Sequence, residues 1–134
     1  MEIFFYGLFM DIKILEQNGV QIRNQGKGHL KDYKLFIGER ASLIPSKGDL
    51  AYGILMNVNA KDLEALYSAP GLSDYIPEEV DIQTEDNQTR SALCYNLPKN
   101  KLSGTNSNYA LALHKLATEL GFPKAYLKHI ERMI

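Results

Sequence analysis

The chain has 134 residues, of which 45% are hydrophobic and 23% charged, proportions typical of one folded domain rather than of a disordered or membrane-spanning chain. Fifteen basic residues nearly balance sixteen acidic ones, so the net charge of −1 excludes a strong field that would attract nucleic acid or an anionic membrane. The lone Cys94 cannot form an internal disulfide, and the apolar N-terminus lacks the pattern of a secretory signal. We therefore expect one domain over residues 1–134, located in the cytoplasm.

The N-terminal part of the sequence predicts a buried strand that leads directly into a helix. Glu2–Tyr6 is apolar and aromatic, as in a buried strand, and apolar residues at helical spacing then predict a helix over Met10–Gln17. The segment Tyr6–Phe9, which contains Gly7, is therefore a turn from strand to helix. Such turns leave backbone N–H groups unpaired at the helix N-terminus, where an anion or a carbonyl oxygen can accept from them.

Several short strands are predicted next, at residues 28–30, 34–38, 41–44 and 50–58. The run Pro45–Asp49 is a strong turn signal between the last two. Gly53, inside the last strand, indicates a bulge or a close approach of another backbone segment. Asn59 is placed to cap a helix over Ala60–Tyr67.

The second half of the chain predicts a hairpin and two helices. The hairpin has strands at Ile76–Thr84 and Thr89–Tyr95, and the polar stretch Leu97–Asn108 that follows has the composition of a mobile loop. A helix beginning near Tyr109 ends at Gly121, and Pro123 suits the first position of the next. Many short strands with few helices favour an α+β fold, a small closed or nearly closed barrel of mixed strands flanked by helices.

The order of several short segments resembles the γ-glutamyl cyclotransferase-like family, which includes the AIG2-like proteins and the γ-glutamylamine cyclotransferases. Phe5–Phe9 resembles the Tyr-Gly-Ser-Leu type of loop of that family. The likeness continues through Arg40–Pro45, Ala51–Leu55, Leu63–Tyr67, Tyr75–Val80 and Ala92–Tyr95, and so covers about the first two-thirds of the chain. No single segment is very specific, and the series in its order and spacing is a much better indication than any one part.

This resemblance implies a six-stranded barrel-like α+β fold with one polar pocket for a small γ-glutamyl-type ligand. Family members release 5-oxoproline when the α-amine of the substrate attacks its own γ-carbonyl, a transferase or lyase type of reaction that needs a base and an acid. One carboxylate can serve as both if burial raises its pKa toward neutrality. The resemblance assigns ligand binding to the turn Tyr6, Gly7, Leu8 and Phe9 and to Tyr75. No metal or organic cofactor is implied.

The family carboxylate is a glutamate shortly before the tyrosine that matches Tyr75, and this chain has Pro70 at that position. Glu78 is the substitute that strand alternation favours, because it shares the inward face with Val80. It could be desolvated there and take over the acid–base role, or it could form a structural ion pair with Arg40. Arg40 in turn could bind a ligand carboxylate through two nitrogens or pair with Glu39 or Glu78.

Three functions therefore remain open from the sequence. The first is an enzyme of γ-glutamyl chemistry that uses Glu78 as a relocated acid. The second is a binding module that holds a small anionic or amide-bearing ligand at the turn without turnover. The third is an interaction scaffold in which bulky Leu8 and Phe9 fill the space over Gly7. Cys94, between apolar neighbours in a strand, is expected to be a core residue rather than a nucleophile.

Overall fold

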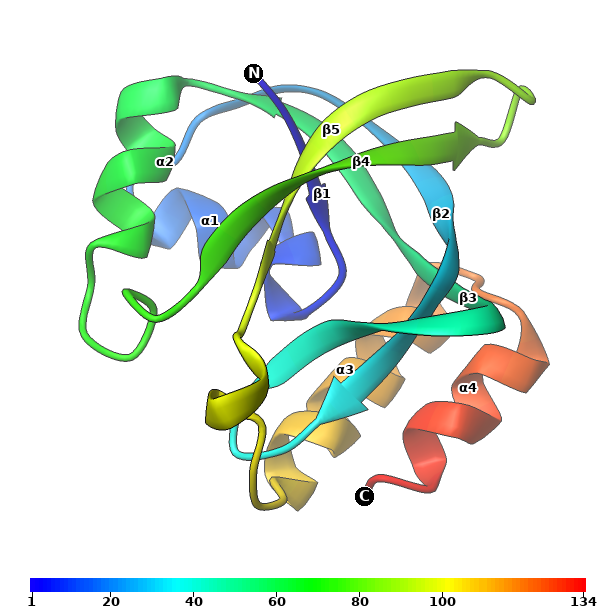
Figure 1. The fold of residues 1–134 in the computed structure, drawn as a ribbon. Coiled ribbons are helices and arrows are strands. Elements are labelled where there is room, and N and C mark those ends of the chain that lie inside the picture. The colour runs from blue at the N-terminus through cyan, green and yellow to red at the C-terminus, as the bar shows by residue number, and fades with distance from the viewer.

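Five strands close into a barrel in this computed structural model, which describes residues 1–134 (Figure 1). The strands are β1 (Glu2–Phe5), β2 (Ile22–Ile37), β3 (Ala41–Val58), β4 (Ile76–Thr84) and β5 (Thr89–Asn96). They follow one another around the barrel in the order β1-β3-β2-β4-β5, and a parallel pairing of Ile3 with Leu93 joins β5 back to β1. All other pairings are antiparallel. The expectation of a small closed barrel of mixed strands is confirmed, with five strands instead of the six that the resemblance implies.

Four α-helices and two 3₁₀ turns surround the barrel. They are η1 (Leu8–Met10), α1 (Ile12–Gln17), α2 (Ala60–Tyr67), η2 (Lys99–Lys101), α3 (Ser107–Glu119) and α4 (Lys124–Glu131). In Figure 1, α1 and α2 flank one side of the barrel, and α3 and α4 lie together at the other end. The predicted cap of α2 is confirmed, because Asn59 Oδ1 accepts from Lys61 N at 2.8 Å. None of the helices has the length and apolar character needed to cross a bilayer.

The seven strands predicted from the sequence become five because two long strands, β2 and β3, replace the four short ones predicted between residues 28 and 58. The predicted turn at Pro45–Asp49 is not a strand end, because β3 continues through it. The pairing steps from Tyr33 opposite Pro45 to Lys31 opposite Leu50, so four residues of β3 stand opposite Asp32 alone. Asp32 adopts a φ of 64°, and its carboxylate accepts from Gly48 N at 2.9 Å. The proline and glycine therefore mark an irregular bulge inside a strand.

The close backbone approach predicted at Gly53 is confirmed. A Cβ atom at this position would lie closer than 3.0 Å to Phe5 O and 2.7 Å from the Phe4 ring. β1 crosses β3 here, with Phe5 paired to Ile54. Only glycine leaves room for this crossing, which fixes where β1 ends and where the following turn begins.

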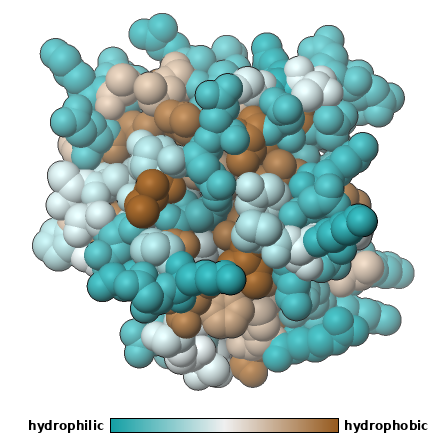
Figure 2. Space-filling model, in the orientation of Figure 1, coloured by the Kyte–Doolittle hydropathy of each residue, from teal (hydrophilic) through white to brown (hydrophobic).

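A continuous apolar core fills the barrel and extends under the helices. Its fully buried members come from every layer, for example Leu15 of α1, Met56 of β3, Ile82 of β4 and Ile130 of α4. The surface seen in Figure 2 is mostly hydrophilic, with apolar side chains showing between polar ones. The prediction that Cys94 is a core residue is confirmed, because its thiol is fully buried.

Candidate functional site

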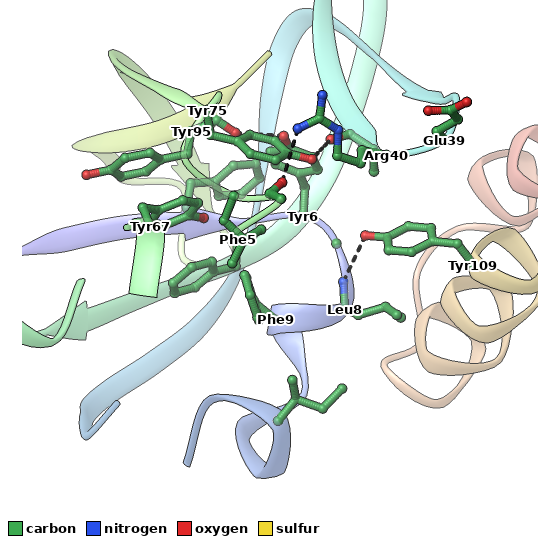
Figure 3. Close-up of a pocket in the computed structure, with 16 residues that line it drawn as sticks. Phe5, Tyr6, Leu8, Phe9, Glu39, Arg40, Tyr67, Tyr75, Tyr95 and Tyr109 are labelled. Carbon is green, nitrogen blue, oxygen red and sulfur yellow. Dashed lines mark hydrogen bonds between the residues drawn. The ribbon is translucent and has the colours of Figure 1, made fainter. Parts of the chain in front are cut away.

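A cavity of about 310 Å³ opens beside the turn that follows β1, and we call it the turn pocket (Figure 3). Its walls come from the turn itself, the β2–β3 hairpin tip, the end of α2 with the loop to β4, β5 and the first turn of α3. Five tyrosines are among the sixteen lining residues: Tyr6, Tyr67, Tyr75, Tyr95 and Tyr109. Its volume is at the small end of ligand sites, which suits a metabolite-sized molecule.

The structure brings all the ligand-binding candidates from the sequence to this cavity. Its lining includes Tyr6, Gly7, Leu8, Phe9, Tyr75 and Arg40. The hydroxyl of Tyr109 occupies the space directly over Gly7, no atom of Phe9 lies within 4 Å of that space, and the cavity opens beside it. The structure thus has a cavity that an interaction scaffold without a pocket would lack.

Two of the pocket tyrosines use their hydroxyl protons to hold the walls in place. Tyr6 donates to the carbonyl oxygen of Tyr95 at 2.7 Å, and Tyr75 donates to that of Ala41 at 2.5 Å. Burial raises the pKa of both phenols above the ordinary value, so both keep their protons at neutral pH. Each bond ties strands from distant parts of the sequence together, so these tyrosines shape the pocket.

Tyr109 is a pocket residue that sequence reasoning missed. Its hydroxyl oxygen accepts a hydrogen bond from Leu8 N at 3.2 Å, and a Cβ atom on Gly7 would lie closer than 3.0 Å to that oxygen. The backbone donor of Leu8, expected to be free for a ligand, is thus already paired. The local signal for the start of α3 is Asn106, which caps the helix by accepting from Tyr109 N at 3.0 Å. No sequence pattern links it to a turn 101 residues earlier.

The polar stretch before α3 fixes Tyr109 in this place. Glu39, at the β2–β3 hairpin tip, donates from its backbone N to Ser103 O at 2.8 Å and accepts at its carbonyl oxygen from Asn106 Nδ2 at 3.1 Å. A Cβ atom on Gly38 would collide with Ser103 O. The segment predicted as a mobile loop is therefore docked on the hairpin tip, and it positions α3 against the pocket.

Arg40 lies on the pocket rim and forms an ion pair with a residue other than the two expected from the sequence. Its Nη1 donates to Asp74 Oδ2 at 3.0 Å and to Gly71 O at 3.1 Å. Its guanidinium carbon lies 5.9 Å from the centre of the Tyr75 ring. Neither Glu39 nor Glu78 forms an ion pair with it. Arg40 therefore closes the loop between α2 and β4 over the pocket, and it supplies the only cationic side chain in the lining.

Glu78 lies outside the turn pocket, inside a polar network of the barrel. Its carboxylate accepts from Asn96 Nδ2 at 2.5 Å and from the Tyr33 hydroxyl at 3.2 Å. Asn96 is buried, and its Oδ1 accepts from Leu43 N at 3.0 Å. Neither Glu78 nor the exposed Pro70 is among the residues lining the turn pocket. The carboxylate in the lining is that of Glu39, an exposed residue.

Comparison with known proteins places this geometry in a family. A family model described as the AIG2-like family matches residues 51–130, more than half of the chain. The chain belongs to the AIG2-like family. The matched range includes the loop with Gly71 and Tyr75 and the start of α3, whereas the turn Tyr6–Phe9 precedes it. No curated protein matches the chain.

Solved structures share the fold of this AIG2-like chain over nearly its whole length. A protein named γ-glutamyl cyclotransferase has a TM-score of 0.80 at 18% identity, covering 100% of this chain and 88% of its own. An uncharacterized protein from Homo sapiens has a TM-score of 0.79 at 20% identity, and the match covers 99% of this chain and 87% of that protein. A γ-glutamyl cyclotransferase from yeast, specific to glutathione, has a TM-score of 0.67 at 11% identity, and the match covers 99% of this chain and 96% of that protein. These likenesses establish the γ-glutamyl cyclotransferase fold.

Proposed function

We propose that this AIG2-like protein binds a small γ-glutamyl-type ligand, one that carries a carboxylate or an amide, in the turn pocket without converting it. The observation that carries the proposal is the lining of the pocket. It combines aromatic walls, hydroxyl and guanidinium donors and a metabolite-sized volume, and its single carboxylate belongs to the exposed Glu39. Structures with the same fold are named γ-glutamyl cyclotransferases, and this supports a γ-glutamyl-type ligand.

The missing buried carboxylate is what argues against turnover. Release of 5-oxoproline needs a group that takes a proton from the attacking ammonium and then protonates the leaving nitrogen. That group must lie within hydrogen-bond reach of the reacting atoms. Phenols with raised pKa values, such as Tyr6 and Tyr75, are poor bases at neutral pH. The pocket therefore has donors for binding and lacks an enclosed base.

The enzyme with Glu78 as a relocated acid is the alternative. Its supporting observation is that Glu78 lies on a strand next to the pocket loop and accepts two hydrogen bonds, which orient its carboxylate. To act, this carboxylate would have to leave Asn96 and Tyr33 and reach the turn pocket. We regard its present contacts as structural.

The buried thiol of Cys94, which forms no disulfide, fits a reducing compartment, and we infer a cytoplasmic location from it.

The test uses L-γ-glutamyl-n-butylamide with the full chain. We expect isothermal titration calorimetry to detect saturable binding and mass spectrometry to detect no 5-oxoproline after prolonged incubation. Formation of 5-oxoproline would refute the non-catalytic proposal, and its loss in Glu78→Gln but not in Glu39→Gln would establish the alternative. Absence of both binding and product would refute both.

A further inference from the structure

The proton of the Tyr109 hydroxyl has no acceptor in the protein. Tyr109 Oη accepts from Leu8 N, and no group of the chain accepts from it in return. Tyr6 and Tyr75, in contrast, donate to backbone carbonyls. Tyr109 lines the cavity, and Figure 3 shows its hydroxyl directed at the turn. A phenol in this arrangement has one donor left for a molecule in the cavity.

Tyr109 carries this proton throughout the neutral range. Burial raises the pKa of Tyr109 to about 12, and the hydrogen bond from Leu8 opposes that rise only in part. The hydrogen bond from Leu8 N occupies one lone pair of the oxygen and leaves the O–H free to rotate toward an acceptor. A ligand oxygen can thus be bound through Tyr109 at the place where the backbone amide itself is already paired.

The rest of the pocket suits an apolar body and has no buried anionic side chain. Tyr67 and Tyr95 stack with their ring centres 3.9 Å apart, and Phe5 and Phe9 complete the aromatic wall. The exposed Glu39 is the one anionic side chain in the lining. A ligand ammonium placed deep in this cavity would lose its hydration without gaining an anionic partner, which is costly.

We propose that Tyr109 determines the specificity of the turn pocket, and that it selects small acyl compounds by donating to their carbonyl or carboxylate oxygen. The ligand class is an amide or carboxylic acid with an apolar substituent, and an α-ammonium group is not required. This inference rests on the proposed function of the same pocket and narrows its ligand. A γ-glutamyl compound binds through its acyl part, and its ammonium stays at the solvated rim.

Two ligands that differ only in the α-ammonium group test this directly. They are L-γ-glutamyl-n-butylamide and N-butylglutaramic acid, titrated by calorimetry into the unaltered protein, into Tyr109→Phe and into Tyr52→Phe. Tyr52 packs on Phe122 and Tyr126 outside the pocket, so its variant controls for loss of a tyrosine hydroxyl elsewhere. Thermal unfolding of each variant shows whether it is folded at the temperature of the titration.

We expect the two ligands to bind the unaltered protein with dissociation constants within about threefold of each other, and Tyr109→Phe to weaken both by about three- to tenfold. Tyr52→Phe should leave both unchanged. Binding of the γ-glutamyl compound more than about tenfold tighter than its partner would overturn the inference and leave the proposed function intact. Binding of N-butylglutaramic acid alone would support the inference and remove the γ-glutamyl ligand from the proposed function. Unchanged binding in a folded Tyr109→Phe would overturn the role of Tyr109 even if the ligand pair behaves as expected.

Discussion

Gly7→Ala is the substitution that examines the wall of the turn pocket most closely. Gly7 has a φ of −106°, which alanine can adopt, so the change introduces no backbone strain. The new Cβ atom would lie closer than 3.0 Å to Tyr109 Oη. Because Leu8 N is hydrogen-bonded to that oxygen, moving Tyr109 away leaves a backbone donor without its partner.

The cost of this change follows from the contacts of the hydroxyl. Loss of a hydrogen bond that leaves a shielded donor unpaired lowers the free energy of unfolding by about 1–3 kcal/mol. In a Tyr109→Phe background the colliding oxygen is absent, and the nearest ring carbon, Cζ, would be 3.6 Å from the new Cβ, an ordinary contact. There Gly7→Ala should cost less than about 0.5 kcal/mol, because alanine also restricts the unfolded chain. The two substitutions should therefore be coupled by about 1–3 kcal/mol.

Urea unfolding followed by far-ultraviolet circular dichroism measures this coupling for the unaltered protein, the two single variants and the double variant. The double variant should be nearly as stable as Tyr109→Phe alone. Additive costs, with a coupling below about 0.5 kcal/mol, would mean that Tyr109 does not lie over Gly7 and would refute the described wall of the pocket.

Three further outcomes are expected. Gly53→Ala should lower the free energy of unfolding by about 1–3 kcal/mol, because the new Cβ meets the backbone of β1. Gly26→Ala is the control: a Cβ there has nothing within 4 Å, so the free energy of unfolding should change by less than about 0.5 kcal/mol. Equal costs of the two variants in urea unfolding would contradict the crossing of β1 over β3. Glu78→Ala should cost about 1–3 kcal/mol in the same measurement, because the amide of the buried Asn96 loses its carboxylate acceptor and keeps only the weakly accepting Cys94 sulfur. An unchanged midpoint would show that the network is not structural. Burial raises the pKa of the Cys94 thiol, so at pH 8 iodoacetamide should modify it only after urea is added, as followed by mass spectrometry; modification of the folded protein at the rate of a free thiol would disprove its burial.

The parts of the fold that sequence reasoning predicted are those specified by local chemistry. The bounds of α2 followed from Asn59 as a cap and from apolar spacing, and β4 followed from alternation ended by a polar turn. Gly53 was identified because a glycine inside an apolar strand indicates a bulge or a close backbone approach, and the structure shows the close approach. Of the pocket, the turn at Gly7 was predicted because a glycine separates an apolar strand from a segment with helical spacing.

The parts that were missed depend on contacts between distant residues. Pro45–Asp49 has the composition of a turn between strands, but pairing with β2 on both sides carries β3 through it as a bulge. Tyr109 belongs to the pocket only because the segment before α3 is bonded to Glu39 at the hairpin tip. Arg40 pairs with Asp74, which lies 34 residues away, and no periodicity predicts that choice.

Nuclear magnetic resonance titration of the ¹⁵N-labelled protein with L-γ-glutamyl-n-butylamide tests most directly whether the turn pocket is a ligand site. Saturable shifts are predicted for the backbone amide signals of Leu8, Gly71, Tyr75 and Tyr109, which surround the cavity, and the added compound should remain intact in the proton spectrum. Unshifted signals at these residues at saturating ligand, or shifts confined to the surface at Gln21–Gln25, would contradict it.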